Sequence, residues 1–508
     1  MKRFLFYILI FSVSVFTAGC NRDRTPKITD AIIKVSDDLT KIRFHEGIDR
    51  FDLQFEANYK WHIEVEGDAF SVTPTSGDAG TAIAAVQLSK RQTVDKITEL
   101  GKFTIVVDNS DAAYTVRVVR LPKAPDGGKT IIAYFFGRDL SYYFSINVNM
   151  MKRAVAAGAL DNGGSLILFR QTSSQQAEIQ ELYFDEDCDS CESITLETIE
   201  FTEDLTAESF GQYFKKAMDY APAANYSAIF LGHSKAWLPK NPIQSTISTY
   251  GFSPKFVPSF DKAPGALVTR DIGEKNVQLD MDELAEGIAS TGVKFNALYF
   301  DVCFMSSLEA AYELRNTADF IIASPCEIMG EGSPYNRILQ PLFDDDYETV
   351  CEEFYKFYES YSVPSGCIAT IDCSKLEAVA DVVKRINAAP TAENFDYSKI
   401  QTYEGRKSYP YAGHWFYDAG DYFTSICSDE ALVREFNERL DECVINRYHT
   451  AEFYSAYNNS FNSIDHFSGI TVTPDEKCIE ASEKSVHREM LEYYNPSLRQ
   501  TAWYQATH

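Results

Sequence analysis

The sequence predicts a multidomain protein in which an all-β sandwich precedes an α/β domain with a mainly parallel, helix-covered sheet. Three observations lead to this prediction. The chain has 508 residues, which is more than a single domain usually holds. Short strands of alternating polarity fill residues 34–121, and continuous apolar strands alternate with helical segments from residue 129 onward. Hydrophobic residues make up 45% of the chain, which is enough for packed cores.

The first 19 residues have the pattern of a targeting signal. A short basic start precedes an apolar run over residues 4–16, which is too short to span a bilayer comfortably. Small residues follow, and then Cys20. This Thr-Ala-Gly-Cys junction resembles a bacterial lipobox, which implies an exported lipoprotein held on a membrane by Cys20, in the periplasm or at the cell surface. The alternative is ordinary secretion with an incidental cysteine. Residues 20–33 are polar and are predicted to be a tether.

Residues 34–121 are predicted to form the β-sandwich. Turn residues separate its alternating segments, and this spacing is typical of two packed sheets. The strands are expected at 50–55, 61–65, 82–88, 103–107 and 114–119. The stretches 58–63, around Trp61, and 70–77 resemble the BACON domain, an immunoglobulin-like module of gut Bacteroidetes proteins. The resemblance implies an immunoglobulin-like fold that serves as a spacer or contacts glycans.

After a linker at residues 122–128, the hydrophobic period changes. Apolar runs of five to seven residues, typical of strands buried on both faces, alternate with helical segments, so the sheet should be parallel and covered by helices. Strands are expected at 130–136, 165–169, 226–231, 295–300 and 320–324, and helices at 147–157, 207–220, 281–290 and 306–315.

Two of these strands end in residues that carry chemistry. The strand at 226–231 leads to His233, and the strand at 295–300 leads to Cys303. Sites in parallel α/β sheets form at the carboxyl ends of strands, so these side chains should face one another if the strands are neighbours. An imidazole near a thiol lowers the thiol pKa and supplies thiolate at neutral pH. The pattern therefore predicts a nucleophilic cysteine with a histidine base.

These motifs resemble those of the clostripain family of cysteine peptidases, which have a caspase-like fold. The match covers residues 129–508 and is most specific at Asp301-Val302-Cys303-Phe304-Met305. It implies that Cys303 attacks the scissile carbonyl and that His233 is the acid–base partner. Backbone N–H groups of Ser234 and Cys303 would form the oxyanion hole. Asp301 would line an S1 pocket for Arg or Lys, assisted by a second acid for which Glu327 and Glu331 are candidates on spacing.

The histidine motif departs from the family pattern. Ser234 and Ala236 replace the two glycines that follow the histidine, and Lys235 lies between them. The predicted function is therefore an exported endopeptidase acting on protein or peptide substrates, and the alternative is a weak or inactive surface-anchored binding protein on the same scaffold. A chloromethyl ketone or similar thiol-directed probe separates the two.

Composition limits the partners and cofactors. The formal net charge of -27 argues against a nucleic-acid partner, which needs Lys and Arg to contact phosphates. No metal site or other cofactor is predicted, and calcium at the acidic runs 185–187 and 344–346 is only weakly indicated, because no EF-hand spacing is present. The pair Cys188 and Cys191 has redox or zinc half-site spacing, but a local disulfide or two free thiols is favoured.

Overall fold

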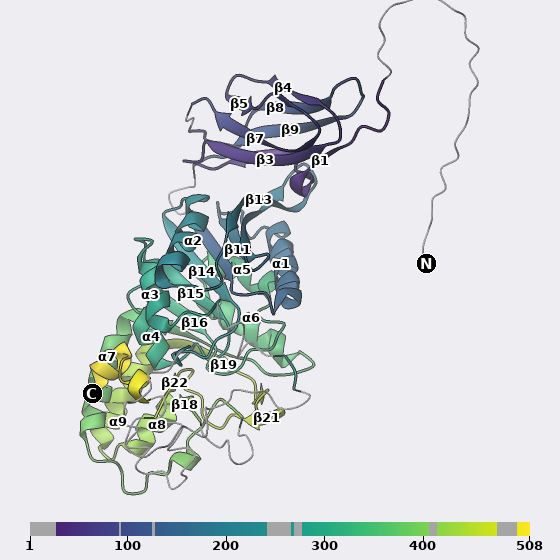
Figure 1. Ribbon diagram of the computed structural model, residues 1–508. Coiled ribbons are helices and arrows are strands. Elements are labelled where there is room, and N and C mark those ends of the chain that lie inside the picture. The colour runs from purple at the N-terminus through teal and green to yellow at the C-terminus, as the bar shows by residue number, and fades with distance from the viewer. Residues whose placement is uncertain are drawn as a thin grey trace, which may run out of the picture. The chain divides into compact units, whose positions relative to one another are not determined.

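The computed structural model describes residues 27–90, 93–123, 128–240, 266–268, 277–405, 414–474 and 495–508. The chain divides into two compact units (Figure 1). The first comprises most of the described residues up to Val118. The second comprises those from Val119 onward, together with 43–49 and 93–98. The predicted signal at residues 1–19 and the predicted lipid site Cys20 lie outside the described residues. The domain limits derived from the sequence stay predictions.

The first unit consists of two sheets. One has the strand order β1(Ile33–Val35), β3(Arg50–Ala57), β7(Gly80–Leu88), β5(Phe70–Thr73). The other has the order β2(Lys41–Phe44), β9(Ala113–Arg120), β8(Thr98–Val107), β4(Trp61–Glu66), β6(Ser76–Gly77). A short 3-10 helix, η1(Ser36–Asp38), follows β1.

The core of this unit lies between the two sheets. Every second residue of β3 is buried, as expected for a strand with one face on a core. Phe55 of one sheet meets Trp61 of the other with ring centroids 4.8 Å apart. Trp61 and Phe70, which lie in the two BACON-like stretches, are both buried. Residues 28–33, expected as part of the tether, also contact the sandwich, since the Ile28 N–H donates to the Asn109 carbonyl at 2.8 Å.

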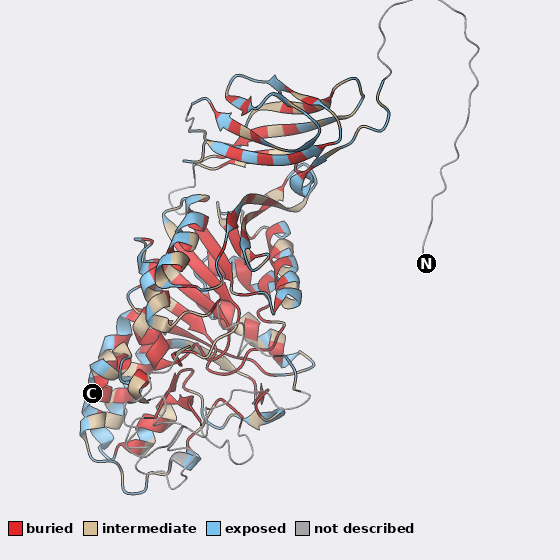
Figure 2. Cartoon of the chain, in the orientation of Figure 1, coloured by how far each residue is buried: buried red, intermediate tan, exposed pale blue. Residues whose placement is uncertain are grey.

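The second unit is built on a nine-stranded sheet. Its order is β13(Ser190–Glu200), β12(Gln176–Asp185), β11(Ser165–Gln171), β10(Lys129–Phe135), β14(Asn225–Leu231), β15(Phe295–Asp301), β16(Ala318–Ala323), β17(Cys367–Asp372), β19(Val444–His449). The central strands are buried almost throughout, as the red strands of Figure 2 show.

The prediction of a mainly parallel sheet holds only for the centre, because the sheet as a whole is mixed. Strands β11, β10, β14, β15 and β16 are parallel to one another, whereas β12, β13, β17 and β19 pair antiparallel. Only residues 172–175 connect β11 to β12. A parallel crossover needs a dozen or more residues, so this short connection forces a hairpin. The parallel centre, which positions the candidate site, agrees with the sequence.

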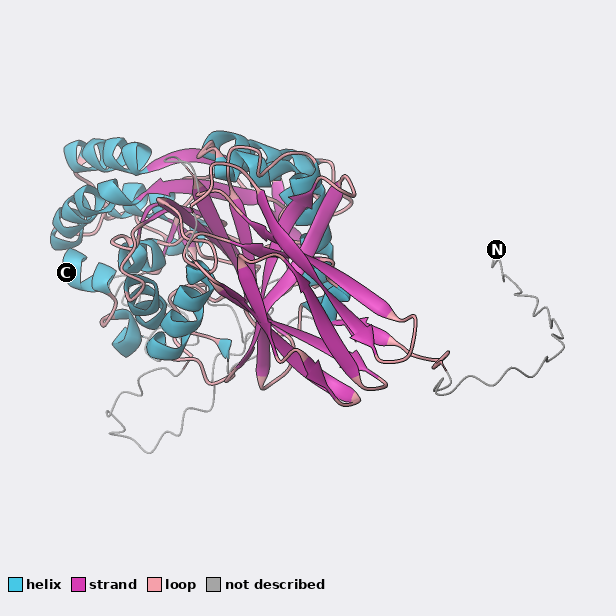
Figure 3. Ribbon diagram, turned by 90° about the horizontal axis from the view of Figure 1, so that it is seen from above, coloured by secondary structure: helices cyan, strands magenta, loops and turns pink. Residues whose placement is uncertain are grey.

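Helices cover both faces of this sheet (Figures 1 and 3). Tyr134 and Phe135 are consecutive in β10 and therefore point to opposite faces. Tyr134 packs on Phe210 of α2(Ala207–Asp219), and Phe135 packs on Phe144 of α1(Ser141–Ala156). With α2 lie α3(Met281–Ala289) and α4(Leu308–Leu314); with α1 lie α5(Tyr335–Phe343) and α6(Tyr347–Glu359).

Further helices and two short strand pairs complete the second unit. The helices are α7(Leu376–Ala388), α8(Ala419–Ile426), α9(Glu430–Cys443) and α12(Ala502–Thr507), with 3-10 helices η3(Cys373–Lys375) and η4(Tyr397–Lys399). Two short antiparallel pairs join β18(Tyr417–Asp418) to β22(Thr471–Val472) and β20(Glu452–Ser455) to β21(Ser460–Ser463). In the part of the chain that the structure describes, no helix has the length and hydropathy needed to cross a membrane.

Candidate active site

The site is set by two adjacent parallel strands. Strands β14 and β15 pair in register, with Leu231 opposite Asp301 at their carboxyl ends. His233 and Cys303 each lie two residues beyond this last pair. The register therefore brings both predicted catalytic residues to the same sheet edge on neighbouring segments. We call residues 232–238 the histidine loop and residues 302–307 the cysteine loop.

Cys303 is completely buried. Its Sγ accepts a hydrogen bond from the Ile328 N–H at 3.1 Å and lies 3.7 Å from the Ile328 carbonyl oxygen. The next residue, Phe304, has φ +61°, a left-handed conformation that is strained for a bulky side chain. The Phe304 N–H donates to the Cys326 carbonyl at 3.1 Å, and its ring stacks on Phe416 with centroids 4.4 Å apart. Packing and backbone bonds together hold the turn that carries the thiol.

His233 is oriented by an acid that the sequence interpretation did not assign. Its Nε2 lies 3.2 Å from Oδ2 of Asp139, and its buried Nδ1 has no hydrogen-bond partner among the described residues. Burial raises the pKa of Asp139, but the hydrogen bond and the charge of His233 outweigh it, so the net pKa lies below the ordinary value. The nitrogen left for a reacting thiol is therefore Nδ1. Asp139 follows β10, the strand beside β14, so the rule of carboxyl strand ends predicts its position.

The histidine loop adapts to the loss of its glycines. Ala236 has φ +52°, the left-handed region that favours glycine. Its N–H donates to the Ser234 hydroxyl at 2.9 Å, which closes a local turn. Trp237 is buried, and its indole N–H donates to the Thr473 hydroxyl at 2.7 Å. The loop thus keeps its turn by side-chain hydrogen bonds.

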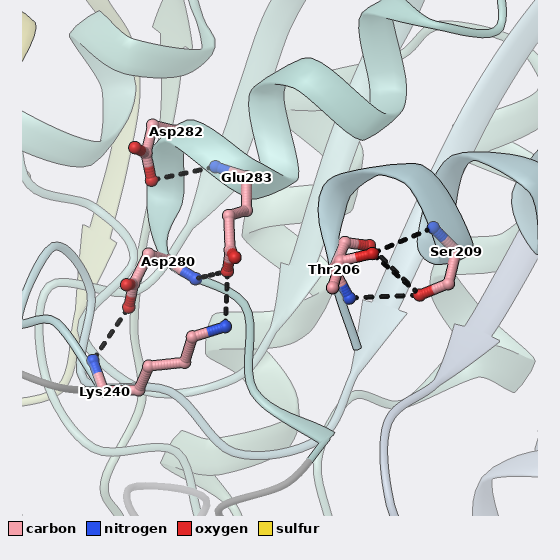
Figure 4. A network of polar contacts seen from close by, with 6 residues as sticks. All are labelled: Thr206, Ser209, Lys240, Asp280, Asp282 and Glu283. Carbon is pink, nitrogen blue, oxygen red and sulfur yellow. Dashed lines mark hydrogen bonds and ion pairs between the residues drawn. The ribbon is translucent and has the colours of Figure 1, made fainter. Parts of the chain in front are cut away.

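The chain leaving the histidine loop is fixed to the start of α3 (Figure 4). The Lys240 N–H donates to Asp280 at 2.8 Å, and its ammonium lies 2.6 Å from Glu283. Glu283 also accepts the Asp280 N–H at 3.0 Å and so caps the helix. The same figure shows the matching cap of α2, in which Thr206 and Ser209 bind each other's N–H groups. The capped N-termini of α2 and α3 therefore lie at the sheet edge that carries the histidine loop.

Asp301, predicted to line an S1 pocket, is fully buried at the end of β15. Its Oδ2 accepts the Ser333 N–H at 3.1 Å and the Tyr335 hydroxyl at 2.6 Å. These bonds tie the carboxylate to the segment that begins α5. Asp301 directly precedes the cysteine loop, and its carboxylate is already engaged by these protein groups.

Glu327, a candidate for the second S1 acid, lies on a segment that is bound to the cysteine loop. It follows Cys326, whose carbonyl binds Phe304, and its carboxylate accepts the Ala456 N–H at 3.1 and 3.2 Å. Glu404 lies close enough to interact electrostatically with it. Burial raises the pKa of Glu404 to about 8, against the opposing effect of the Trp415 and Phe416 N–H groups. No local sequence motif identifies Glu404, so its proximity to Glu327 becomes evident only in the folded chain. Glu331, the other spacing candidate, accepts the Asn147 side-chain N–H at its backbone carbonyl.

A small pocket of about 70 Å³ opens beside His233 on the α3 side. Apolar side chains of the two catalytic strands, Phe230 and Phe300, form its wall, and Met305 of the cysteine loop and Leu284 of α3 extend it. The imidazole therefore borders a small, mainly apolar hollow on the α3 side.

Thiols elsewhere in the described residues are free, including Cys188 in the turn between β12 and β13 and Cys191 at the start of β13. Of the two alternatives favoured for Cys188 and Cys191, the structure agrees with two free thiols and not with a local disulfide. Burial raises the pKa of Cys191 to about 12. Among the described residues, no group of three or more His, Cys, Asp or Glu side chains is arranged to hold a metal ion.

Comparisons with known proteins place this geometry in a family. The sequence model of the clostripain family matches residues 134–470. A solved secreted C11 cysteine protease from Bacteroides thetaiotaomicron is 32% identical, with a TM-score of 0.62 over 75% of this chain and 99% of that one. A second C11 protease from that organism, solved with an irreversible peptide inhibitor, shares the fold at 22% identity and a TM-score of 0.59, over 75% of this chain and 98% of its own. An inactive zymogen C11 protease from Parabacteroides distasonis also shares the fold, at 22% identity and a TM-score of 0.59, over 76% of this chain and 99% of its own.

A search of curated proteins finds no match. The family match spans more than half of the chain, and the 32% identical structure is covered almost completely. It includes both strands that lead to His233 and Cys303. This chain therefore belongs to the clostripain family of cysteine peptidases.

Proposed function

We propose that the protein is an exported cysteine endopeptidase in which Cys303 is the nucleophile and His233 its acid–base partner. The observation that carries the proposal is the register of β14 and β15, which starts both loops at one sheet edge. The orientation of His233 by Asp139 supports it, since Nδ1 is then left for the thiol proton. Asp139 fixes the imidazole and stabilises its charged form, as the third member of a catalytic triad does.

The reaction follows from these positions. His233 Nδ1 takes the thiol proton, and the Cys303 sulfur attacks the scissile carbonyl to form a tetrahedral intermediate. Backbone N–H groups of Ser234 and Cys303 stabilise its oxyanion. The imidazolium then gives the proton to the departing amine, and water hydrolyses the acyl-enzyme with His233 as base. The sulfur is buried beneath Ile328 in this structure, so substrate access requires displacement of that contact.

Preference for Arg or Lys at P1 is the second part of the proposal. Asp301 and Glu327 are the proposed S1 acids, and Glu404 beside Glu327 adds a third buried carboxyl. A cationic side chain entering this region would gain charge-assisted hydrogen bonds and would favour ionisation of Glu404. The binding energy should therefore depend on these carboxylates and not on the apolar pocket at His233.

Export and attachment form the third part. The two solved relatives from Bacteroides thetaiotaomicron are described as secreted, and this chain begins with the pattern of a lipoprotein signal. We infer that Cys20 carries a lipid and that the BACON-like residues 34–121 are a spacer with possible glycan contact. Mass spectrometry of the membrane-bound protein tests the lipid, and loss of membrane attachment in Cys20→Ser is the expected result.

The central test combines turnover with covalent labelling. Purified protein is assayed on reporter peptides ending in Arg, Lys, Leu or Asp, and is then treated with a Lys chloromethyl ketone. We expect cleavage after Arg and Lys, label on Cys303, and loss of both in Cys303→Ala with an unchanged melting temperature. Cys188→Ala is the matched control, because Cys188 is an exposed thiol outside the site.

Mass spectrometry of the labelled protein also reads any internal cut that accompanies access to the buried thiol. Turnover that survives in Cys303→Ala, or label that is spread evenly over all cysteines, contradicts the dyad. Equal cleavage after Leu and Lys contradicts the acidic S1 pocket while leaving the dyad intact.

A further inference from the structure

The segment 469–473 contacts both loops of the proposed active site, although it lies far from both in sequence. We propose that this segment, which we call the clasp, together with Glu309 and Trp237, positions the histidine loop against the cysteine loop. The inference rests on the proposed function of His233 and Cys303. It assigns a positioning role to Trp237, Thr473 and Glu309, none of which touches the reacting atoms.

On the cysteine side, the clasp is bound to the end of the cysteine loop by backbone and side chain. The Ser306 hydroxyl donates to the Gly469 carbonyl at 2.6 Å, and the Thr471 N–H donates to the Ser306 carbonyl at 2.9 Å. Ser307 and Thr471 form a parallel β-bridge. Because Ser306 is three residues beyond Cys303, movement of the clasp is transmitted directly to the turn that carries the thiol.

Glu309 adds the next contact. It lies in the first turn of α4, where it is 1% exposed, and its Oε1 accepts the Thr473 N–H at 2.7 Å. Burial raises the pKa of Glu309 to about 7, although the Thr473 and Ser307 groups that bind it act in the opposite direction. A buried carboxyl near neutrality costs stability when it ionises, so a glutamine should serve its role of hydrogen-bond acceptor equally well.

On the histidine side, the contact is a single buried hydrogen bond. The Trp237 indole N–H donates to the Thr473 hydroxyl at 2.7 Å, and both side chains are buried. Trp237 is four residues beyond His233, next to the strained Ala236. Thr473 therefore connects the two loops, since its hydroxyl binds Trp237 and its N–H binds Glu309.

The first experiment compares Thr473→Val with Thr473→Ser in the full-length protein. Valine removes the hydroxyl that binds Trp237 and keeps the volume, whereas serine keeps the hydroxyl. Loss of a buried hydrogen bond that leaves the indole N–H unpaired should lower kcat about tenfold in Thr473→Val, with KM changed less than about twofold. Thr473→Ser should stay within about twofold of the parent.

Two further variants separate positioning from general stability. Glu309→Gln should keep activity, and Glu309→Leu should lose it, because only glutamine still accepts the Thr473 N–H. The matched control is Glu313→Leu on the same helix, since Glu313 binds the Ala502 N–H of the C-terminal helix at 3.1 Å instead of the clasp. Trp237→Phe combined with Thr473→Val should be no worse than either alone, as expected for two ends of one bond.

Hydrogen exchange of residues 232–240 provides a readout that does not depend on turnover. Exchange should rise in Thr473→Val and not in Thr473→Ser. If the parent protein cleaves peptides but Thr473→Val keeps the kcat of Thr473→Ser, the clasp is not a positioning device. If the parent shows no turnover, the proposed function fails, and hydrogen exchange alone then decides whether Thr473 couples the two loops. Unchanged exchange of residues 232–240 in Thr473→Val would contradict the positioning role of the clasp.

Discussion

The cysteine loop and the histidine loop lie side by side at one sheet edge, yet they are held in different ways. The cysteine loop is buried throughout and is bound by backbone groups of other segments, as in Phe304 to Cys326 and Thr471 to Ser306. The histidine loop is held by side chains, namely Asp139 at His233, Ser234 at Ala236 and Thr473 at Trp237.

Both loops contain a non-glycine residue in the left-handed region. The contacts that offset its backbone strain also differ between the two loops. Phe304 is held at φ +61° by stacking on Phe416 inside the core. Ala236, at φ +52°, has only a methyl group to bury, and a serine hydroxyl supports its turn. Strain persists only where the surroundings fix it, so the cysteine loop should depend on packing and the histidine loop on polar contacts.

The largest expected effect comes from removing the packing that holds the cysteine loop. Phe416→Ala deletes a 1% exposed ring that stacks on Phe304. It should lower the free energy of unfolding by about 3 to 5 kcal/mol, as for other buried Phe to Ala changes, and should slow labelling of Cys303. Chemical denaturation measures the first effect. Phe461→Ala, at a side chain that is 40% exposed, is the control and should cost far less. A small loss in Phe416→Ala would mean that the turn is not held by packing.

The next effect is a pH dependence centred on Glu404, which binds the backbone beside Phe416. Its pKa of about 8 exceeds the unfolded value of 4.5, so its stabilising contribution is full below about pH 4.5 and is lost as pH rises toward 8. Glu404→Gln cannot ionise, and any hydrogen bond it loses costs the same at every pH. Its free energy of unfolding, relative to the parent, should therefore rise by about 3 kcal/mol from pH 5 to pH 8. Urea titrations at the two pH values measure this difference, and a constant difference would contradict the buried, neutral carboxyl.

Much of this comparison was predictable from the sequence. The continuous apolar runs before His233 and Cys303 predict buried strands, which occur at 225–231 and 295–301. That the two strands are neighbours was a condition of the prediction, and the structure meets it. The carboxyl-end rule then places both residues at one edge. The same rule would have selected Asp139, which follows β10, the strand beside β14 in the parallel centre.

Other features could not be predicted, for identifiable reasons. The strands β12 and β13 alternate between apolar and polar residues because one is near the edge and the other is the edge, so they lack the continuous apolar run that marks the central strands. Glu309, Glu404 and Thr473 gain their roles from contacts between segments more than 10 residues apart. No local period encodes such contacts. The only sequence indication of the positive φ at Ala236 is that this residue replaces a glycine of the family motif.

A smaller effect is expected from the acid that orients His233. Asp139→Asn keeps the size of the side chain but removes its charge, and the amide can present an N–H toward Nε2. Loss of a charge-assisted hydrogen bond should lower kcat/KM roughly ten- to a hundredfold and leave the unfolding free energy nearly unchanged. Steady-state kinetics on the Lys reporter peptide measure this change. Arg138→Gln, which breaks the adjacent exposed ion pair with Glu203, is the control and should have little effect. Equal activity in Asp139→Asn would show that packing alone orients the imidazole.

The smallest effect tests the strain in the histidine loop itself. Ala236→Gly removes the clash of a Cβ in the left-handed region, worth about 1 kcal/mol, but glycine adds about 0.4 to 1 kcal/mol of unfolded-state entropy cost. The two nearly cancel, so the melting temperature should change by no more than a degree or two. The strain should instead be visible in the active site, where a relaxed loop lets Ser234 present its N–H more freely, and kcat should rise about two- to threefold. Phe304→Gly is the contrasting variant, because there the lost ring outweighs the relieved strain and stability should fall. A clear gain in stability in Phe304→Gly would show that the two loops store strain in the same way.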